Sequence, residues 1–188
     1  MLGRAVAVMC VALLSSCSLL PLHPGAFYDD SKQQTDVKMQ RIADAVKSQD
    51  EPALKKLFSQ RALDKATDLD RGLKYFLSAF PTGPVTWKSQ GSGSESQNES
   101  LKQIVELYGE YEVTGGGKKY ELYFAYFSAN DYDSQNVGIY ALGVVPASEN
   151  GYTASGAKKP FNVWASQFGI DEKTHTATGD PGVYVPQN

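Results

Sequence analysis

Apolar residues recur at helical spacing in the segment that follows residue 35. Met39, Ile42, Ala43 and Val46 stand at positions i, i+3, i+4 and i+7, which form one stripe along an α-helix. Thr35 can accept a hydrogen bond from a free backbone N–H at a helix start, and Asp36 adds a negative charge in the first turn. The pattern therefore predicts a helix that begins at Thr35.

Two further amphipathic helices are predicted before residue 81. Asp50 is the expected N-cap of the second helix, with Pro52 in its first turn. Pro81 is expected to end the third helix. Each helix has one narrow apolar face, so all three need another layer to pack against. The stripe of the second helix is Leu54, Leu57, Phe58 and Ala62, and that of the third is Leu69, Leu73, Phe76, Leu77 and Phe80.

Four later segments alternate between apolar and polar residues and are rich in Val, Ile, Tyr and Phe, which is typical of β-strands. They are residues 85–89, 103–114, 118–129 and 137–145. Glycines at 115–117 can adopt the positive φ of a tight hairpin turn. A four-residue loop would place Glu112 opposite Glu121, so we favour a turn at 115–116, which places it opposite Lys119. Residues 89–100 contain no apolar side chain and are expected to form a solvated loop.

Strand parity assigns each side chain of the second and third strands to one face of the sheet. The predicted fold class is α+β, with three N-terminal helices packed on a curved antiparallel meander sheet. Trp164 and Phe168 are expected to dock on this domain, and residues 182–185 to form a last short strand. The predicted core face carries Val105, Leu107, Tyr111, Val113, Leu122, Phe124 and Tyr126, and the opposite face carries Glu106, Tyr108, Glu110, Glu112, Glu121, Tyr123 and Phe127.

The first residues have the features of an export signal. Arg4 precedes the apolar run 5–14, which is shorter than the roughly 20 residues that cross a bilayer. Residues 14–17, Leu-Ser-Ser-Cys, resemble the bacterial lipobox. That resemblance implies cleavage before Cys17 and a lipid on its sulfur, with palmitate-type acyl chains as the membrane anchor. We expect a signal peptide at 1–16, a lipidated tether at 17–34 and a single domain at 35–188 on the extracytoplasmic side of the cell membrane, with residues 146–188 as a docked tail.

Four stretches of the chain together resemble one family of bacterial lipoproteins. They are residues 41–59, the strand of Trp87 before a Ser- and Glu-rich segment, residues 111–124 and residues 136–145. The family is an uncharacterised branch with a nuclear-transport-factor-2-like (NTF2-like) domain of unknown function. The resemblance implies a cone of helices against a bent sheet, and it implies no catalytic residue.

Charge and side-chain chemistry exclude several function classes. Without the signal peptide, the chain has 17 basic and 21 acidic residues, and this mild acidity argues against nucleic-acid binding. The two cysteines are Cys10, in the signal, and Cys17; the two histidines are His23, in the tether, and His175, which we expect to be solvated near the C-terminus. A metal site or a histidine-based catalytic triad needs more ligands or a positioned histidine, so we expect no cofactor and no metal.

Aromatic side chains are the remaining functional signal, because nine of the 21 lie between Tyr108 and Tyr140. Core packing and the strand preference of aromatic residues are the ordinary explanation. Trp87, Tyr111, Phe124 and Tyr126 could line a pocket for a small amphipathic ligand, which would make the chain a binding module for a ligand or an envelope protein. Tyr108, Tyr123 and Phe127 could instead pair two copies in a structural homodimer.

A pocket enzyme of the isomerase or dehydratase type is the remaining alternative. Such an enzyme needs an acid inside the cone, where an apolar environment shifts its pKa. Strand parity places no acid there. Asp64, Asp68 and Asp70 flank the third helix and are expected to be caps or surface residues.

Overall fold

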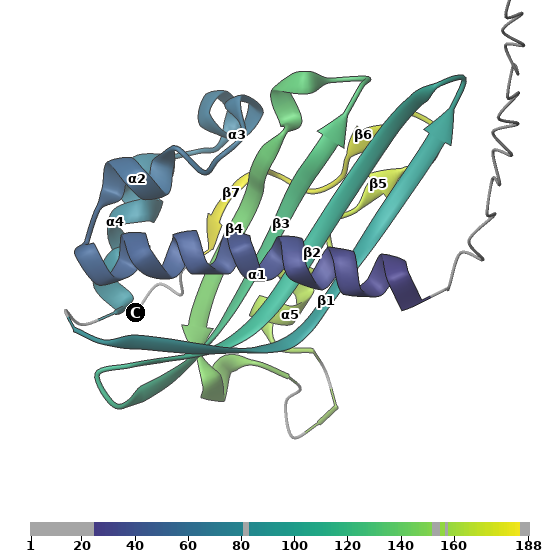
Figure 1. Ribbon diagram of the computed structural model, residues 1–188. Helices are drawn as coiled ribbons and strands as arrows, with labels where there is room; N and C mark the ends of the chain where they lie inside the picture. Colours follow the sequence, from purple (N-terminus) through teal and green to yellow (C-terminus); the bar gives the residue numbers. More distant parts are fainter. Residues whose placement is uncertain (1–24, 81–82, 152–154, 157, 185–188) are drawn as a thin grey trace, which may run out of the picture.

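Helix α1 (Gly25–Ser48) lies across one face of a bent β-sheet in the computed structural model, and three shorter helices gather at one end of it (Figure 1). These are α2 (Glu51–Lys55), α3 (Gln60–Lys65) and α4 (Leu69–Ala79). The structure describes residues 25–80, 83–151, 155–156 and 158–184.

The sheet has the strand order β1-β2-β3-β4-β7 and is mostly antiparallel. Its strands are β1 (Val85–Glu99), β2 (Lys102–Gly115), β3 (Lys118–Asn130), β4 (Gly138–Pro146) and β7 (Gly182–Tyr184), the last of which pairs with β4 in parallel. Two short strands, β5 (Ile170–Asp171) and β6 (Thr176–Ala177), form a separate pair after helix α5 (Pro160–Ala165). The predicted α+β class, with helices before an antiparallel sheet, is confirmed, as is the last short strand.

Helix α1 begins at Gly25, so the predicted start at Thr35 is wrong. Thr35 is fully buried inside the helix, and its hydroxyl donates to the carbonyl oxygens of Ser31 and Lys32, both at 3.0 Å. Ser31 and Thr35 extend the buried stripe of Met39 toward the N-terminus in steps of four residues. A search for apolar residues misses these two small polar ones. Residues 25–34, predicted as part of the tether, are therefore helical.

The predicted second helix is divided into α2 and α3. Asp50 caps α2 as predicted, accepting from the Ala53 N–H at 2.8 Å. Between the helices the chain pairs with β4, because Ser59 N–H donates to the Ile139 carbonyl at 2.9 Å. Ser59 then caps α3 by accepting from the Ala62 N–H. This backbone pairing interrupts the helix, although the apolar stripe that predicted it still faces the core, with Leu57 only partly buried.

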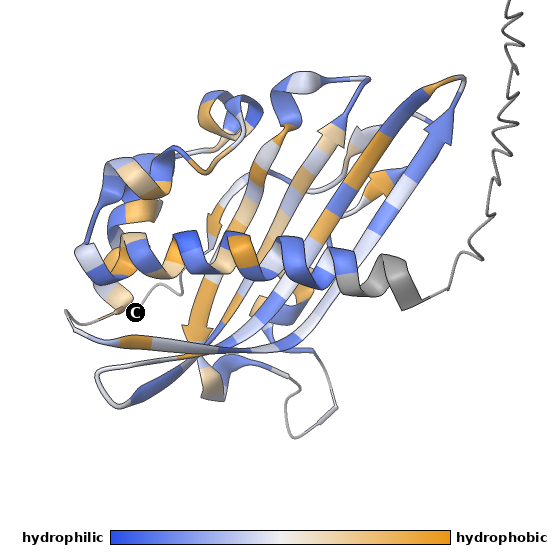
Figure 2. Ribbon diagram, in the orientation of Figure 1, coloured by the Kyte–Doolittle hydropathy of each residue, from blue (hydrophilic) through white to orange (hydrophobic). Residues whose placement is uncertain are grey.

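Strand β1 includes the polar segment that was predicted to be a solvated loop, and that prediction is wrong. The strand pairs with β2 from Val85 to Glu99, with one irregularity between Ser89 and Gly91. It lies at the edge of the sheet, and Figure 2 shows how hydrophilic its second half is. An edge strand can be polar because it bonds to one neighbour only and keeps its other edge in solvent.

The β2–β3 hairpin has a two-residue turn, but its register differs from the predicted one. Gly116 and Gly117 occupy the turn with φ of 57° and 76°, and Glu112 faces Glu121 instead of Lys119. Both turn positions need a positive φ, and the run of three glycines allows more than one placement. Lys119 offsets the repulsion by donating to both oxygens of Glu112, at 2.9 and 3.0 Å.

The core lies between the helices and the sheet, and strand parity predicted most of its sheet side correctly. Tyr111, Val113, Leu122 and Phe124 are buried among the helices. Leu107 is buried, Tyr126 is partly buried, and Val105 is only half-buried beside an irregularity in the β2–β3 pairing.

The opposite sheet face is covered by the C-terminal segment, which lies behind the sheet in Figure 1. Phe161, Trp164 and Phe168 pack against Tyr123 and its neighbours, and Ile170 packs near Phe127. The prediction that Trp164 and Phe168 dock on the domain is confirmed. This cover creates a second apolar layer that strand parity alone did not predict.

A candidate ligand-binding groove beside α1

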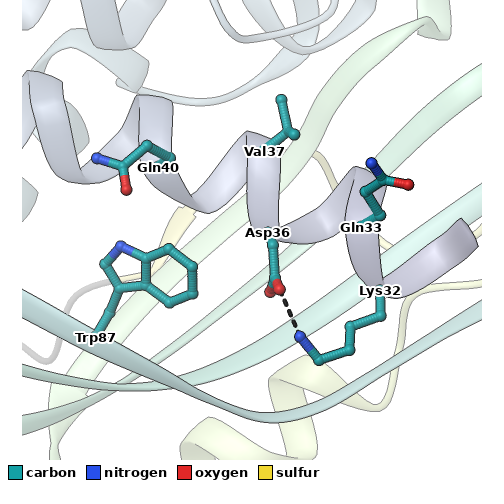
Figure 3. A pocket seen from close by; sticks show the side chains of 6 residues that line it. All are labelled: Lys32, Gln33, Asp36, Val37, Gln40 and Trp87. Carbon is teal, nitrogen blue, oxygen red and sulfur yellow. Dashed lines mark hydrogen bonds and ion pairs between the residues drawn. The ribbon is translucent and has the colours of Figure 1, made fainter. Parts of the chain in front are cut away.

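A groove of about 440 Å³ lies between α1 and β1 (Figure 3). We call it the α1 groove. Five of its side chains come from α1 because residues three and four apart share one side of a helix. The sixth is Trp87, which reaches under the helix from β1. The lining residues are Lys32, Gln33, Asp36, Val37, Gln40 and Trp87.

Trp87 is held from below by the core. Its indole is partly buried and meets the Tyr111 ring edge-on, with centroids 5.4 Å apart. Tyr111 in turn stacks on Phe124 at 5.8 Å. The three rings form a row that runs from the groove into the interior, so the indole is fixed before any ligand arrives.

Asp36 is the acidic group of the groove, and its side chain is 26% exposed. Its carboxylate accepts a hydrogen bond from the Tyr111 hydroxyl at 3.0 Å and pairs with the Lys32 ammonium. Burial, together with this carboxylate, raises the pKa of Tyr111 well above its ordinary value, so the phenol stays protonated and donates. The groove thus combines one carboxylate and one ammonium with carboxamides and an apolar floor.

Sequence reasoning missed Asp36 because it placed this residue in the first turn of a helix. With α1 starting at Gly25, Asp36 lies in the middle of the helix and faces β1 and β2. The sequence carried no separate signal for Asp36, because the burial of its neighbour Thr35 is visible only in the structure.

The four residues predicted to line a ligand pocket do not surround one cavity. Tyr111 and Phe124 are fully buried and fill the interior. Trp87 lines the α1 groove, whereas Tyr126 lines a separate depression on the other side of α1.

The predicted partner face is largely covered by the same chain. Tyr123 and Phe127 are buried, packed on Phe168 and Tyr140 respectively. Tyr108 is 40% exposed. Two of the three residues are therefore already in contact with other parts of the molecule.

His175 is held in place and is not solvated as predicted. Its side chain is 20% exposed and stacks on Tyr132 with ring centroids 4.5 Å apart. Its Nδ1 lies 2.9 Å from Gln97 Oε1, and its Nε2 lies 2.8 Å from Glu99 Oε2. Because both ring nitrogens are engaged, His175 attaches the β5–β6 hairpin to β1 and offers no free nitrogen to a substrate or metal.

Glu106 is a second feature that strand parity did not predict, because parity places it on the sheet face opposite the core and does not show what covers that face. Its side chain is 2% exposed, opposite Glu95 of β1. Burial, and secondarily the charge of Glu95, raises the pKa of Glu106 to about 8.

Metal binding, membrane crossing and the export signal are the remaining functional features. Within the part of the chain that the structure describes, no group of three or more His, Cys, Asp or Glu side chains is placed to hold a metal ion. None of the described helices combines the length and apolar character needed to cross a bilayer. The predicted signal peptide and Cys17 lie outside the described residues.

One protein family matches part of this chain. Residues 41–147 match a family model described as "Domain of unknown function (DUF5104)". That span includes α2 to α4 and β1 to β4, whereas most of the C-terminal cover lies beyond it. No curated protein matches the chain.

Proposed function

Starting from the fact that the chain belongs to the DUF5104 domain family, we propose that it is a non-catalytic binding module of the bacterial cell envelope. A lipid on Cys17 holds it on the extracytoplasmic side of the cell membrane. Its fold is NTF2-like, and the order of helices before a bent antiparallel sheet supports this assignment, as does the passage of α1 across the sheet.

The observation that carries the binding function is Trp87 in the α1 groove. An indole fixed by Tyr111 offers a rigid apolar surface, and little conformational entropy is lost when a ligand packs on it. Gln33 and Gln40 also line the groove and can each donate and accept hydrogen bonds. A small amphipathic molecule matches this combination, since binding pockets pair an apolar surface with a few polar groups.

The test is ligand binding by the full-length chain in neutral detergent. A thermal-shift screen against envelope metabolites, glycans and amphipathic lipids should identify a stabilising compound, whose affinity is then measured by calorimetry. Trp87→Ala is expected to weaken that affinity, whereas Tyr75→Ala, at an exposed aromatic residue of α4, leaves it unchanged. If both variants bind with equal affinity, the α1 groove is not the binding site. If the screen finds no compound that stabilises the protein, that result counts against the binding function itself.

Anchoring is tested separately in a bacterial host by labelling with radioactive palmitate and by intact mass. Cys17→Ser is expected to lose the label and Cys10→Ser to keep it, because only Cys17 ends the lipobox. An uncleaved and unlabelled wild-type chain would contradict the lipid anchor.

A pocket enzyme is the second candidate, and the Asp36–Tyr111 hydrogen bond is the observation that favours it. A carboxylate beside a phenol in a cleft can move a proton between substrate atoms. Against it, Asp36 is already paired with Lys32, and Tyr111 is buried in the core. Turnover of an isomerase or dehydratase substrate that is abolished by Asp36→Asn, with binding retained, would replace the non-catalytic proposal.

A structural homodimer through the outer sheet face has less support, because the C-terminal segment covers most of that face. Sedimentation of Tyr108→Asp beside the wild-type chain tests it. A dimer that dissociates in the variant would favour this third role.

A further inference from the structure

A second depression, of about 310 Å³, lies on the other side of α1 and includes Tyr126 of β3. We call it the Lys38 pocket. At 3.6 residues per turn, Lys38 and Arg41 lie on the side of the helix away from Lys32 and Asp36, whereas Gln33 and Val37 line both depressions. The two depressions therefore use different charged groups, and the second does not depend on the function proposed for the first.

Lys38 and Arg41 give this pocket a local positive charge in a chain whose net charge is −3. Among the described residues, no carboxylate forms an ion pair with either of them. Among the described residues that line the pocket, the carboxylate is that of Asp30, which accepts a hydrogen bond from Gln34 at 3.1 Å. This described lining thus carries two cations and one acid.

The Lys38 ammonium lies over the Tyr126 ring, 4.1 Å from its centroid. The ring face attracts the cation and fixes its position. Burial, and then repulsion from Arg41, lowers the pKa of Lys38. Two neighbouring cations that repel each other are a cost to the free protein, and an anion placed between them would remove it.

We propose that the Lys38 pocket binds a phosphate group, either of a soluble phosphate ester or of an anionic phospholipid headgroup. Arg41 supplies a planar fork of donors and Lys38 a point charge, a pair that suits the several oxygens of a phosphate. The Tyr126 ring holds the Lys38 ammonium in place.

The first experiment uses the full-length wild-type chain in nanodiscs, with lysines labelled for NMR. Because no residue is substituted, the result does not depend on whether a variant folds. In phosphatidylcholine nanodiscs, inorganic phosphate is expected to raise the pKa of Lys38, and acetate at equal ionic strength is expected to raise it less. Nanodiscs with phosphatidylglycerol are the second arm. A rise there without added phosphate supports the proposal and identifies a headgroup as the source. No rise in either arm, or an equal rise with acetate, overturns it.

Variants then locate the site by calorimetry with inorganic phosphate. Lys38→Met and Arg41→Gln are expected to weaken binding about tenfold or more, because each removes a charged donor. Lys74→Met, at an exposed lysine of α4, is the matched control and should bind like the wild-type chain. Equal losses of affinity in all three variants would show that phosphate is attracted non-specifically by positive charge, and this would overturn the assigned site.

Discussion

Replacing Glu106 with Gln should remove most of a pH dependence of stability that this residue creates. Glu106 is 2% exposed in the sheet face covered by the C-terminal segment, and burial raises its pKa from 4.5 to about 8. In the unfolded chain the carboxyl loses its proton near 4.5, whereas the folded chain keeps it. The folded state therefore binds more protons between these values, and stability must fall as the pH rises through this interval.

The size of the effect follows from the two pKa values. Each pH unit between 4.5 and about 8 costs about 1.4 kcal/mol of unfolding free energy, and the whole interval costs about 5 kcal/mol. That is a large part of the roughly 5–15 kcal/mol that stabilises a typical domain. A neutral amide of nearly the same shape does not titrate, so Glu106→Gln should be the more stable protein above about pH 8.

Urea unfolding between about pH 5 and 9, followed by circular dichroism, measures this slope. Other groups titrate in the same interval, but they do so in both proteins, so the difference between the two curves isolates Glu106. Glu110→Gln is the matched control, because Glu110 is an exposed residue of the same strand, and its curve should follow the wild type. Parallel curves for the wild type and Glu106→Gln between about pH 5.5 and 7.5 would refute the reasoning.

Three further substitutions test individual contacts, each by urea unfolding. Tyr111→Phe should cost about 1–2 kcal/mol by removing the hydrogen bond to Asp36 while keeping the ring, and an unchanged stability would mean that this bond contributes nothing. Gly143→Ala should cost about 1–3 kcal/mol, because a Cβ would lie 2.5 Å from the Trp164 ring; a fully stable variant would show that the C-terminal cover can shift freely. Gly117→Ala should cost about 1 kcal/mol through its φ of +76° alone, since no atom lies within 4 Å, and a neutral result would argue against this turn geometry.

The chain's hydrophobic periodicity was sufficient to predict the main helices and strands. Asp50 as a cap, the end of α4 before Pro81 and the helix-facing sides of β2 and β3 all follow from local patterns. The break between α2 and α3 could not be predicted this way, because it depends on pairing of Ser59 with β4, eighty residues later in the chain. Strand β1 was predicted only as far as residue 89. Its polar second half was missed for a similar reason, because the hydrogen bonds that hold it in the sheet come from the distant strand β2.

The candidate site was predicted less completely than the fold. Trp87 was identified, but the other three predicted residues separate into core positions and a second pocket. The start of α1 decides which polar residues face the sheet, so an error of ten residues there concealed Asp36 and Lys38. The burial of Glu106 was also hidden, because it depends on a C-terminal segment far away in sequence.

That C-terminal segment has a practical consequence for anyone who shortens this protein. A fragment that ended with the family match at residue 147 would lack Phe161, Trp164 and Ile170, and it would bring Tyr123, Phe127 and Ala141 into contact with water. An exposed hydrophobic surface of this kind promotes aggregation and proteolysis. Recombinant versions should therefore extend to at least Tyr184. A higher yield of soluble protein from the longer version would indicate that the sheet needs this cover.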